Sequence, residues 1–283
     1  MKKEVKSFAK INLHLAVGPK REDGFHNLQS IFAKISLFDL IKIEAKESKT
    51  LKINIEGLDN CELIGEDTIT KAIKLWCEYT KHNLEVNVNI EKNIPIKAGL
   101  GGGSSNAAYT LKTINEMFCD YALSEKTLLK IGLMIGSDVP FFLHDTTFAY
   151  VEGQGEIITK LDAKFDYEIQ LYKPQIGVST KGAFDKLDNI KRQPFINKQT
   201  LINAFYKGVE SWKNSFFNDF ELVINSEILK SLNILDDEFV HLSGSGSTCF
   251  IVCNNFPKCY NKFTLNQQIK NNIYYKSCFF SNI

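Results

Sequence analysis

The sequence carries almost no net charge and contains no long apolar run. Its 34 lysine and arginine residues are nearly balanced by 33 aspartate and glutamate residues, which gives a formal net charge of +1. Proteins that bind nucleic acid tend to carry a clustered basic surface, so this balance argues against a nucleic-acid partner. The sequence has no run of about 18 apolar residues either, and we therefore expect no membrane span.

Seven cysteines are scattered along the chain, but none of them forms a C-x-x-C pair. Zinc and dithiol motifs usually contain such pairs, so we expect no metal site built from cysteine and histidine. Cys249 and Cys253 alternate with apolar residues in STCFIVC, which favours buried free thiols on one face of a strand. The N-terminus does not resemble a signal peptide, because Lys10 and His14 interrupt its apolar part. These features predict a cytoplasmic protein.

Hydrophobic residues make up 44% of the sequence and charged residues 24%, a composition typical of a globular protein that buries a core. Alternating or extended apolar patterns predict strands, at 4–17, 29–45, 51–57, 84–95, 147–161, 167–174, 239–253 and 273–280. Helical spacing predicts helices at 66–80, 104–118 and 124–136, and the segment 137–143 is expected to be extended. This mixture predicts an α+β fold of two packed domains, residues 1–158 and 159–283.

A glycine-rich stretch, PIKAGLGGGSSNAAYTL at residues 95–111, has four glycines within five positions. It joins a strand that ends at Pro95 to a helix that starts near Ser104, with Ser104 or Ser105 as the expected N-cap. One interpretation is a tight turn without a ligand, since glycine is the usual residue where φ must be positive. The other is a phosphate-binding loop, because a helix N-terminus offers unpaired N–H groups and a partial positive charge.

Other phosphate-loop patterns do not fit this stretch. The Walker pattern needs a lysine and a Ser/Thr after its last glycine, but two serines and Asn106 follow here. The dinucleotide fingerprint fits poorly because the acidic residue that it requires does not occur in a βαβ context. Protein-kinase HRD and DFG motifs are absent. We therefore expect a phosphate cradle of a third kind, with the Ser104 and Ser105 hydroxyls available for phosphate or Mg²⁺.

Four blocks of the sequence, in order, resemble the GHMP family of small-molecule kinases. PIKAGLGGGSSNAA is similar to the second motif of that family, P-x3-G-L-[GS]-[GS]-S-[AS]. GSDVPFFL and LSGSGSTCFIV resemble its GADVPFF-like segment and its glycine-rich third motif. SFAKINLHLAVGPKREDGFHNLQSIF resembles the N-terminal signature of the branch that acts on a cytidine diphosphate-linked methylerythritol. The four blocks reach both ends of the chain, which makes the resemblance specific.

This resemblance implies the two-domain GHMP kinase fold, with a ribosomal-protein-domain-2-like N-terminal domain and a ferredoxin-like C-terminal domain. It implies that ATP, with Mg²⁺, phosphorylates the 2-hydroxyl of the cytidine diphosphate-linked methylerythritol, in non-mevalonate isoprenoid precursor synthesis. ATP and this small-molecule substrate would meet in a cleft between the domains. The enzyme would be a monomer or homodimer without nucleic-acid or membrane partners.

Lys10 and Asp138 are the catalytic residues that the resemblance implies. On their own they indicate little, because a strand lysine is usually a solvated charge and an aspartate before Val-Pro is a common turn or N-cap residue. Matched to the family, Lys10 is the lysine of the AKIN motif and stabilises the attacking hydroxyl. Asp138 then accepts the hydroxyl proton or acts electrostatically, and Lys10 keeps it ionised.

The resemblance also implies two sets of binding residues. The ATP-binding residues are Pro95, Ile96, Lys97, Ala98, Gly99, Leu100, Gly101, Gly102, Gly103, Ser104 and Ser105. The substrate-binding residues are Asn12, Phe25, His26, Thr180, Phe184, Gly244, Ser245 and Gly246. Phe25 would stack on the cytosine, His26 would read its hydrogen-bonding edge, and Phe184 would close its other side. The family more often has tyrosine at position 25, so this chain keeps the stacking face and loses one polar contact.

Purely structural interpretations and two other functions stay open. Phe25 and His26 also fit a loop anchor, and SGSGST fits a tight turn without a ligand. Another GHMP enzyme, such as a mevalonate or homoserine kinase, would share the glycine loop, although DGFHNLQS argues against it. A non-catalytic nucleotide- or RNA-binding module would leave Lys10 and Asp138 without a purpose.

Overall fold

The computed structural model describes residues 1–58, 65–174, 178–224, 239–253 and 273–281. Contacts divide the chain into two compact units whose segments interleave along the sequence. Unit 1 consists of Met1–Ala9, Leu37–Ile96 and Gly101–Asp145. Unit 2 consists of Lys10–Ser36, Lys97–Leu100 and Thr146–Ile283. The division into domains 1–158 and 159–283 stays a prediction.

The strands of unit 1 follow the order β3-β4-β2, and β1 pairs with β2. Their bounds are β1 Lys2–Lys20, β2 His26–Glu47, β3 Lys52–Glu56 and β4 Leu84–Glu91, and β1 and β2 continue into unit 2. β4 runs antiparallel to β2, with Leu40 opposite Glu91, and parallel to β3. Every second residue of β4 from Leu84 to Ile90 is buried, so the alternation seen in the sequence sets its core face.

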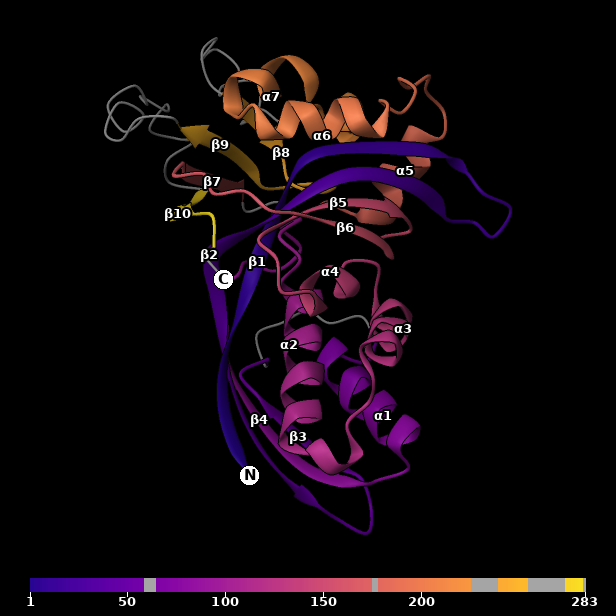
Figure 1. Cartoon of the computed structure of the whole chain (residues 1–283), viewed down its shortest axis with the longest axis vertical. Coiled ribbons are helices and arrows are strands. Elements are labelled where there is room, and N and C mark those ends of the chain that lie inside the picture. The colour runs from indigo at the N-terminus through magenta and orange to yellow at the C-terminus, as the bar shows by residue number, and fades with distance from the viewer. Residues whose placement is uncertain (59–64, 175–177, 225–238, 254–272, 282–283) are drawn as a thin grey trace. The chain divides into compact units, whose positions relative to one another are not determined.

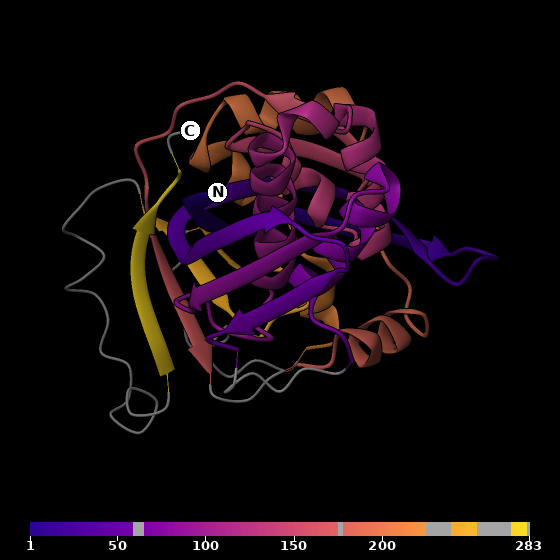
Figure 2. The ribbon, with the colours of Figure 1, turned by 90° about the horizontal axis from the view of Figure 1, so that it is seen from below.

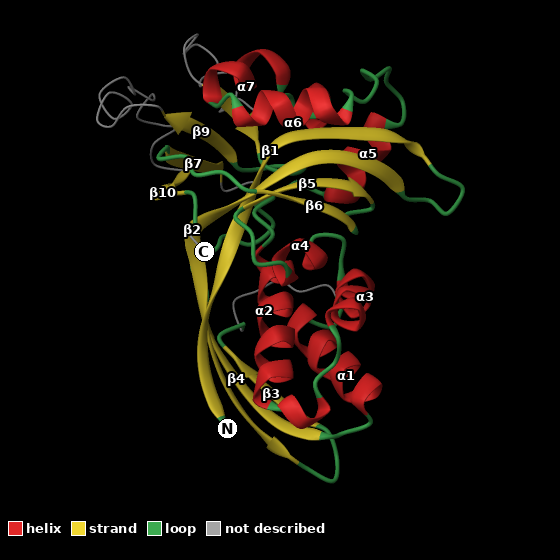
Figure 3. Ribbon diagram, in the orientation of Figure 1, coloured by secondary structure: helices red, strands yellow, loops and turns green. Residues whose placement is uncertain are grey.

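Helices cover one face of the unit 1 strands (Figures 1 and 3). Their bounds are α1 Thr68–Thr80, α2 Gly102–Met117, the 3-10 helix η1 Cys119–Tyr121, α3 Glu125–Ile135 and α4 Val139–Leu143. Asp67 caps α1 by accepting from the amides of Ile69 and Thr70, and Ser124 caps α3 by accepting from Thr127. The predictions of α1 and α3, including the capping serine, are confirmed.

Two local predictions in unit 1 are wrong. Neither Ser104 nor Ser105 caps α2, because the helix begins at Gly102 after Gly101, whose φ of 69° is a left-handed conformation that glycine adopts readily. The segment 137–143 is not extended, since Val139–Leu143 forms the short helix α4. A short apolar run such as VPFFL does not distinguish a buried helix from a strand, and Pro140 is tolerated in a first helical turn.

Unit 2 contains two groups of strands. β2 pairs with β5, Phe148–Gly153, which pairs with β6, Ile157–Leu161. A separate antiparallel sheet has the order β10-β7-β9-β8, with bounds β7 Glu168–Pro174, β8 Phe239–Leu242, β9 Cys249–Cys253 and β10 Ile273–Phe279. Figure 2 shows β10, in yellow, beside β7. Cys249 and Cys253 are buried and form no disulfide, as the sequence predicts.

The described helices of unit 2 are α5 Thr180–Leu187, α6 Lys198–Tyr206, α7 Val209–Ser215 and the 3-10 helix η2 Asp219–Leu222. Trp212 of α7 is fully buried in an aromatic core, with ring centroids 5.1 Å from Phe165 and 5.7 Å from Phe239. Its indole N–H donates to the carbonyl of Phe205 at 2.9 Å, so the ring is buried with its polar atom satisfied. Across the described residues, no helix has the length and apolarity that a membrane crossing requires.

Candidate active site

The second half of the glycine loop forms the start of α2 in unit 1. A Cβ placed on Gly102 would lie 3.0 Å from Ile94 Cγ2 and 3.6 Å from Lys92 Nζ. Thr68 Oγ1 donates to the carbonyl of Gly103 at 2.7 Å, which ties the loop to α1. The first helical hydrogen bond of α2 comes from the amide of Ser105 to Gly101. The amides of residues 102–104 therefore have no acceptor within the helix. Such N-terminal amides favour the binding of an anion.

Ser105 faces inward from this helix start. Its side chain is fully buried, its hydroxyl donates to the Phe8 carbonyl at 2.6 Å, and Ser7 Oγ lies 2.8 Å from it. Ser7 also donates to Asn106 Oδ1 at 2.7 Å. These bonds attach α2 to β1, and the contact of Ser105 with ATP stays a prediction.

A buried ion pair anchors the residues that lead into the loop. Asp39 is fully buried, and its Oδ1 accepts from the amides of Asn93 and Ile94, both at 2.8 Å. Its Oδ2 accepts from the Lys92 ammonium. Because Lys92 Nζ also lies beside Gly102, Asp39 fixes a cation at the start of α2. Asp39 supplies the anion that makes this cation tolerable at the positive end of the helix, so the pair orients the entry to the loop.

Asp138 stands at the N-terminus of α4, also in unit 1. Its backbone is in the N-cap position, but its carboxylate makes no cap hydrogen bond. The side chain therefore does not cap the helix, whereas the interpretation of Asp138 as a turn residue agrees with its place in the turn 137–138. A Cβ on Gly136 would lie 3.7 Å from Ser104 Oγ, so the turn before Asp138 lies against the first turn of α2.

Unit 2 contributes the environment of Lys10. This lysine is only 3% exposed, and its ammonium donates to Asn12 Oδ1 at 2.7 Å. It also lies 4.7 Å from the centroid of the Phe32 ring, within cation–π range. Asn12 in turn donates from Nδ2 to Ser30 Oγ at 3.0 Å. The Lys10 ammonium is therefore shielded from water and fixed by Asn12 and Phe32. The interpretation of Lys10 as a solvated surface charge is wrong.

The first half of the glycine loop packs directly on the SGSGST turn of unit 2. Ser243 Oγ donates to the Gly99 carbonyl at 2.8 Å, and the Thr248 amide donates to Ala98 at 3.3 Å. Gly99 has a φ of 75°, and a Cβ there would overlap the carbonyl oxygen of Ser243. The Gly244 amide donates to Asn12 Oδ1 at 2.9 Å. Two glycine motifs distant in sequence thus meet backbone to backbone beside Lys10.

Several of the residues predicted to bind substrate contact one another in pairs within unit 2. His26 and Phe184 stack at a centroid distance of 5.0 Å, and His26 Nδ1 lies 2.9 Å from the Gly18 carbonyl. Since a carbonyl only accepts, Nδ1 carries a proton, which leaves Nε2 facing Asp188 Oδ1 at 3.6 Å. Phe25 is 54% exposed. The hydroxyl groups of Thr180 and Ser245 are hydrogen-bonded to each other at 3.0 Å.

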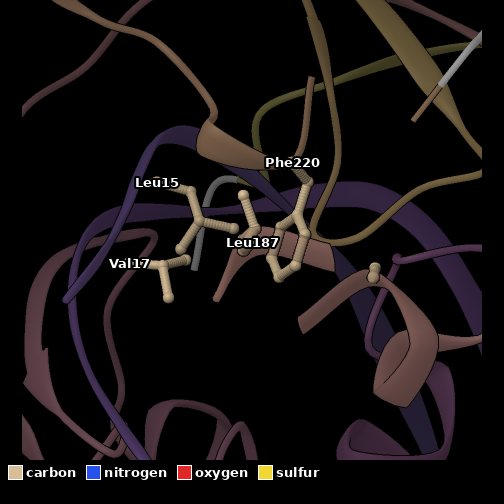
Figure 4. Close-up of a cluster of buried hydrophobic side chains, with 5 residues drawn as sticks. Leu15, Val17, Leu187 and Phe220 are labelled. Carbon is tan, nitrogen blue, oxygen red and sulfur yellow. The ribbon is translucent and has the colours of Figure 1, made fainter. Parts of the chain in front are cut away.

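A buried apolar cluster supports the helix that carries Phe184. It contains Leu15, Val17, Leu187 and Phe220, all labelled in Figure 4, together with Ala183. Phe184 packs edge-on against Phe220, with ring centroids 4.9 Å apart. The cluster therefore fixes α5 against β1 and η2, and with it the position of the Phe184 ring.

Sequence reasoning missed the polar residues of FFNDFEL. Asn218 and Asp219 are 3% and 2% exposed, and together with Glu221 they accept from or donate to backbone groups of distant segments. The available signal was that two polar side chains lie between phenylalanines and a third follows the last of them, because polar groups are costly to bury unless each is hydrogen-bonded. That pattern does not predict which backbone groups these side chains bind.

Comparison with known proteins agrees with this geometry. The family model "GHMP kinases N terminal domain" matches residues 67–146. A 4-diphosphocytidyl-2-C-methyl-D-erythritol kinase of Prochlorococcus marinus (strain MIT 9215) is 34% identical, over 94% of this chain and 90% of its own length. The Caldicellulosiruptor bescii kinase of the same name is 36% identical, over 89% of this chain and 90% of its own.

Solved structures give the same result. A crystal structure of 4-(cytidine 5'-diphospho)-2C-methyl-D-erythritol kinase aligns with a TM-score of 0.76 and 25% identity, over 99% of this chain and 100% of that chain. The fold and its glycine motifs are thus those of the GHMP kinases. Within that class, the chain belongs to the 4-diphosphocytidyl-2-C-methyl-D-erythritol kinase family.

Proposed function

We propose that this chain transfers the γ-phosphoryl group of ATP to the 2-hydroxyl of 4-diphosphocytidyl-2-C-methyl-D-erythritol. The observation that carries the proposal is the identity of 34% over 94% of the chain with a kinase of that substrate. We place the reaction in the cytoplasm, in a monomer or homodimer that needs no nucleic acid, and assign it to non-mevalonate isoprenoid synthesis.

We assign the ATP phosphates to the loop of residues 95–105. The residues fit this group, because Gly99 and Gly101 have positive φ and the amides of 102–104 lie at a helix start. Lys92, paired with Asp39, places an ammonium group beside Gly102. Within the loop, Ser104 is the hydroxyl that we expect nearest the phosphates, because the Ser105 hydroxyl is engaged with Phe8.

Mg²⁺ would neutralise charge on the ATP phosphates. Among the residues that the structure describes, no group of three or more His, Cys, Asp or Glu could hold a metal by itself. Kinase Mg²⁺ is bound largely by the phosphates and water, with only one or two protein oxygens. The Ser104 hydroxyl is suited to be such a ligand.

Phosphoryl transfer depends mainly on positioning and on stabilising charge. We propose that the Lys10 ammonium stabilises negative charge on the attacking 2-oxygen, since burial strengthens its field. Asp138 accepts the proton that this hydroxyl loses, or stabilises it electrostatically. Asn12 accepts a hydrogen bond from Lys10, so we propose that Asn12 acts on the substrate partly by holding the Lys10 ammonium in place.

We propose that Phe25, His26 and Phe184 bind the cytosine. His26 Nδ1 is engaged with the Gly18 carbonyl, so Nε2, which faces Asp188, is the ring nitrogen that remains to contact the cytosine edge. Phe184 stacks on His26, and binding between Phe25 and Phe184 would require the Phe184 ring to turn away from that stack. Thr180, Gly244, Ser245 and Gly246 would contact the remaining part of the substrate.

An ADP-release assay tests the proposed function. We expect turnover with ATP and 4-diphosphocytidyl-2-C-methyl-D-erythritol, and only background release with homoserine or mevalonate as acceptor. Turnover that prefers one of those two alcohols would assign the chain another GHMP activity. Binding of ATP without turnover on any of the three would contradict the proposal.

A further inference from the structure

Asn218 uses its side-chain amide to join three backbone groups of unit 2. Nδ2 donates to the carbonyls of Leu242 at 2.8 Å and Gly244 at 2.9 Å. Oδ1 accepts from the Phe220 amide at 3.0 Å. One N–H donor is therefore used on the last residue of β8 and the other on the SGSGST turn, on either side of Ser243, and the side chain is almost completely buried.

Gly244 lies between Asn218 and the site of Lys10. Its carbonyl accepts from Asn218, while its amide donates to Asn12 Oδ1 at 2.9 Å. The same Asn12 oxygen accepts from the Lys10 ammonium at 2.7 Å. Gly244 adopts a left-handed φ of 56°, and these two bonds orient the peptide groups on either side of it.

We propose that Asn218 is a positioning residue for phosphoryl transfer, which acts through Gly244 and Asn12 to hold the Lys10 ammonium in place. Without Asn218, the carbonyls of Leu242 and Gly244 lose their side-chain donor, and the Gly244 amide is less well oriented toward the Asn12 oxygen. Asn12 keeps its bond to Ser30 but loses part of the support of its oxygen, so the Lys10 ammonium is held less precisely. The inference rests on the proposed kinase function, in which Lys10 stabilises the attacking oxygen.

Asp219 offers a matched control on the same helix. It is equally buried, and its Oδ2 accepts from the Val17 amide at 2.7 Å, farther along β1 from Lys10. Asp219→Ala thus removes a buried anchor between η2 and β1 without touching Gly244. Asn218→Ala and Asp219→Ala should both lower the melting temperature, but only the first should disturb the Lys10 site.

The test is a double-mutant cycle with Lys10→Ala, using steady-state kinetics on folded protein. Asn218→Ala should lower kcat by about 10-fold or more with little change in KM, because small displacements of a catalytic group are costly. In the Lys10→Ala background the same substitution should have almost no further effect on kcat, because the two residues act as one unit. Asp219→Ala should leave kcat near that of the unchanged protein at temperatures where it is folded.

Losses that multiply in the double variant would show that Asn218 acts independently of Lys10 and would overturn the inference. An unchanged kcat in folded Asn218→Ala would overturn it as well. If Asn218→Ala melts below the assay temperature, Asn218→Ser replaces it, since a hydroxyl still accepts from Phe220 but does not span both carbonyls. If the unchanged protein itself lacks activity, the proposed function fails instead, so the two failures are distinguishable.

Discussion

At the residue scale, Lys10 differs from an ordinary strand lysine in what surrounds its ammonium. An amide oxygen and an aromatic face contact it, and the side chain is withdrawn from water. A desolvated cation interacts more strongly with a developing negative charge than a hydrated one does. This arrangement suits the stabilisation of an alkoxide-like oxygen.

Replacement of Asp138 tests the other proposed catalytic residue. Asp138→Asn should lower kcat by about 10²–10⁴-fold, the range typical of a lost general base, because the amide cannot take the hydroxyl proton. ATP binding, measured by calorimetry, should change little, since the substitution keeps the shape of the side chain. A variant with the original kcat would remove Asp138 from the mechanism.

Replacement of Gly99 tests the close approach of the two glycine motifs. Gly99→Ala should destabilise the protein by more than the about 1–2 kcal/mol that left-handed φ alone costs, because the added Cβ overlaps the Ser243 carbonyl. Gly24→Ala is the control, since Gly24 has a φ of 83° with nothing within 4 Å of the added Cβ. Equal denaturation midpoints for the two variants would contradict this packing.

At the scale of elements, Asp39 joins the end of β4 to the residues that enter the glycine loop. It accepts from Lys92, Asn93 and Ile94, so one carboxylate fixes the loop entry and a cation at the start of α2. The loop is thereby held before any ligand arrives. A preorganised loop loses less conformational freedom when ATP binds.

Asp39→Ala should destabilise the protein by about 1–3 kcal/mol, because it leaves the partly buried Lys92 ammonium and two amides without their acceptor. Urea denaturation measures this change. Glu44→Ala, which breaks the exposed Lys2–Glu44 pair, is the control and should have little effect. Similar losses in the two variants would contradict the anchoring role of Asp39.

The sequence predicted elements whose signals are local. Helical spacing predicted α1, the capping residue Ser124 predicted the start of α3, and the alternation of β4 predicted its buried face. The start of α2 was wrong by two residues, because glycine at Gly101 replaces a side-chain cap with a backbone conformation. α4 was missed because its five residues contain no period long enough to distinguish helix from strand.

The candidate site was predictable only in part, because only some of its residues lie in local sequence patterns. The glycine motifs and Lys10 carry recognisable patterns, so their residues could be named from the sequence. The contact of Gly99 with Ser243, and the anchors Asn218 and Asp39, depend on segments far apart in the chain. Such long-range pairs leave no periodic signal, and only the structure reveals them.

At the scale of the whole molecule, His14 links stability to pH. Burial, followed by the nearby His241, lowers the pKa of His14 to about 3, and its Nδ1 accepts from the Phe217 amide at 3.3 Å. Between about pH 3 and 6.5, the unfolded chain therefore binds a proton at His14 that the folded protein does not. Stability then falls as the pH is lowered through this range, because protons favour the unfolded state.

The expected slope from His14 is about 1.4 kcal/mol per pH unit well below pH 6.5. His14→Phe, which preserves an aromatic ring beside Phe216 and Phe217, should remove this contribution. Urea denaturation from pH 4 to 7 would compare the two slopes, whatever the absolute stability of the variant. Identical slopes would show that His14 is not neutral and buried.

The most direct measurement on the kinase is the proton-coupled phosphorus NMR spectrum of its product from ATP and 4-diphosphocytidyl-2-C-methyl-D-erythritol. Carbon 2 of this substrate carries a methyl group and no hydrogen, so a phosphate on its oxygen has no three-bond proton coupling. We predict a new phosphomonoester singlet together with the signals of ADP. A doublet or triplet, from transfer to the 3- or 1-hydroxyl, or the absence of any new phosphomonoester, would contradict the proposed reaction.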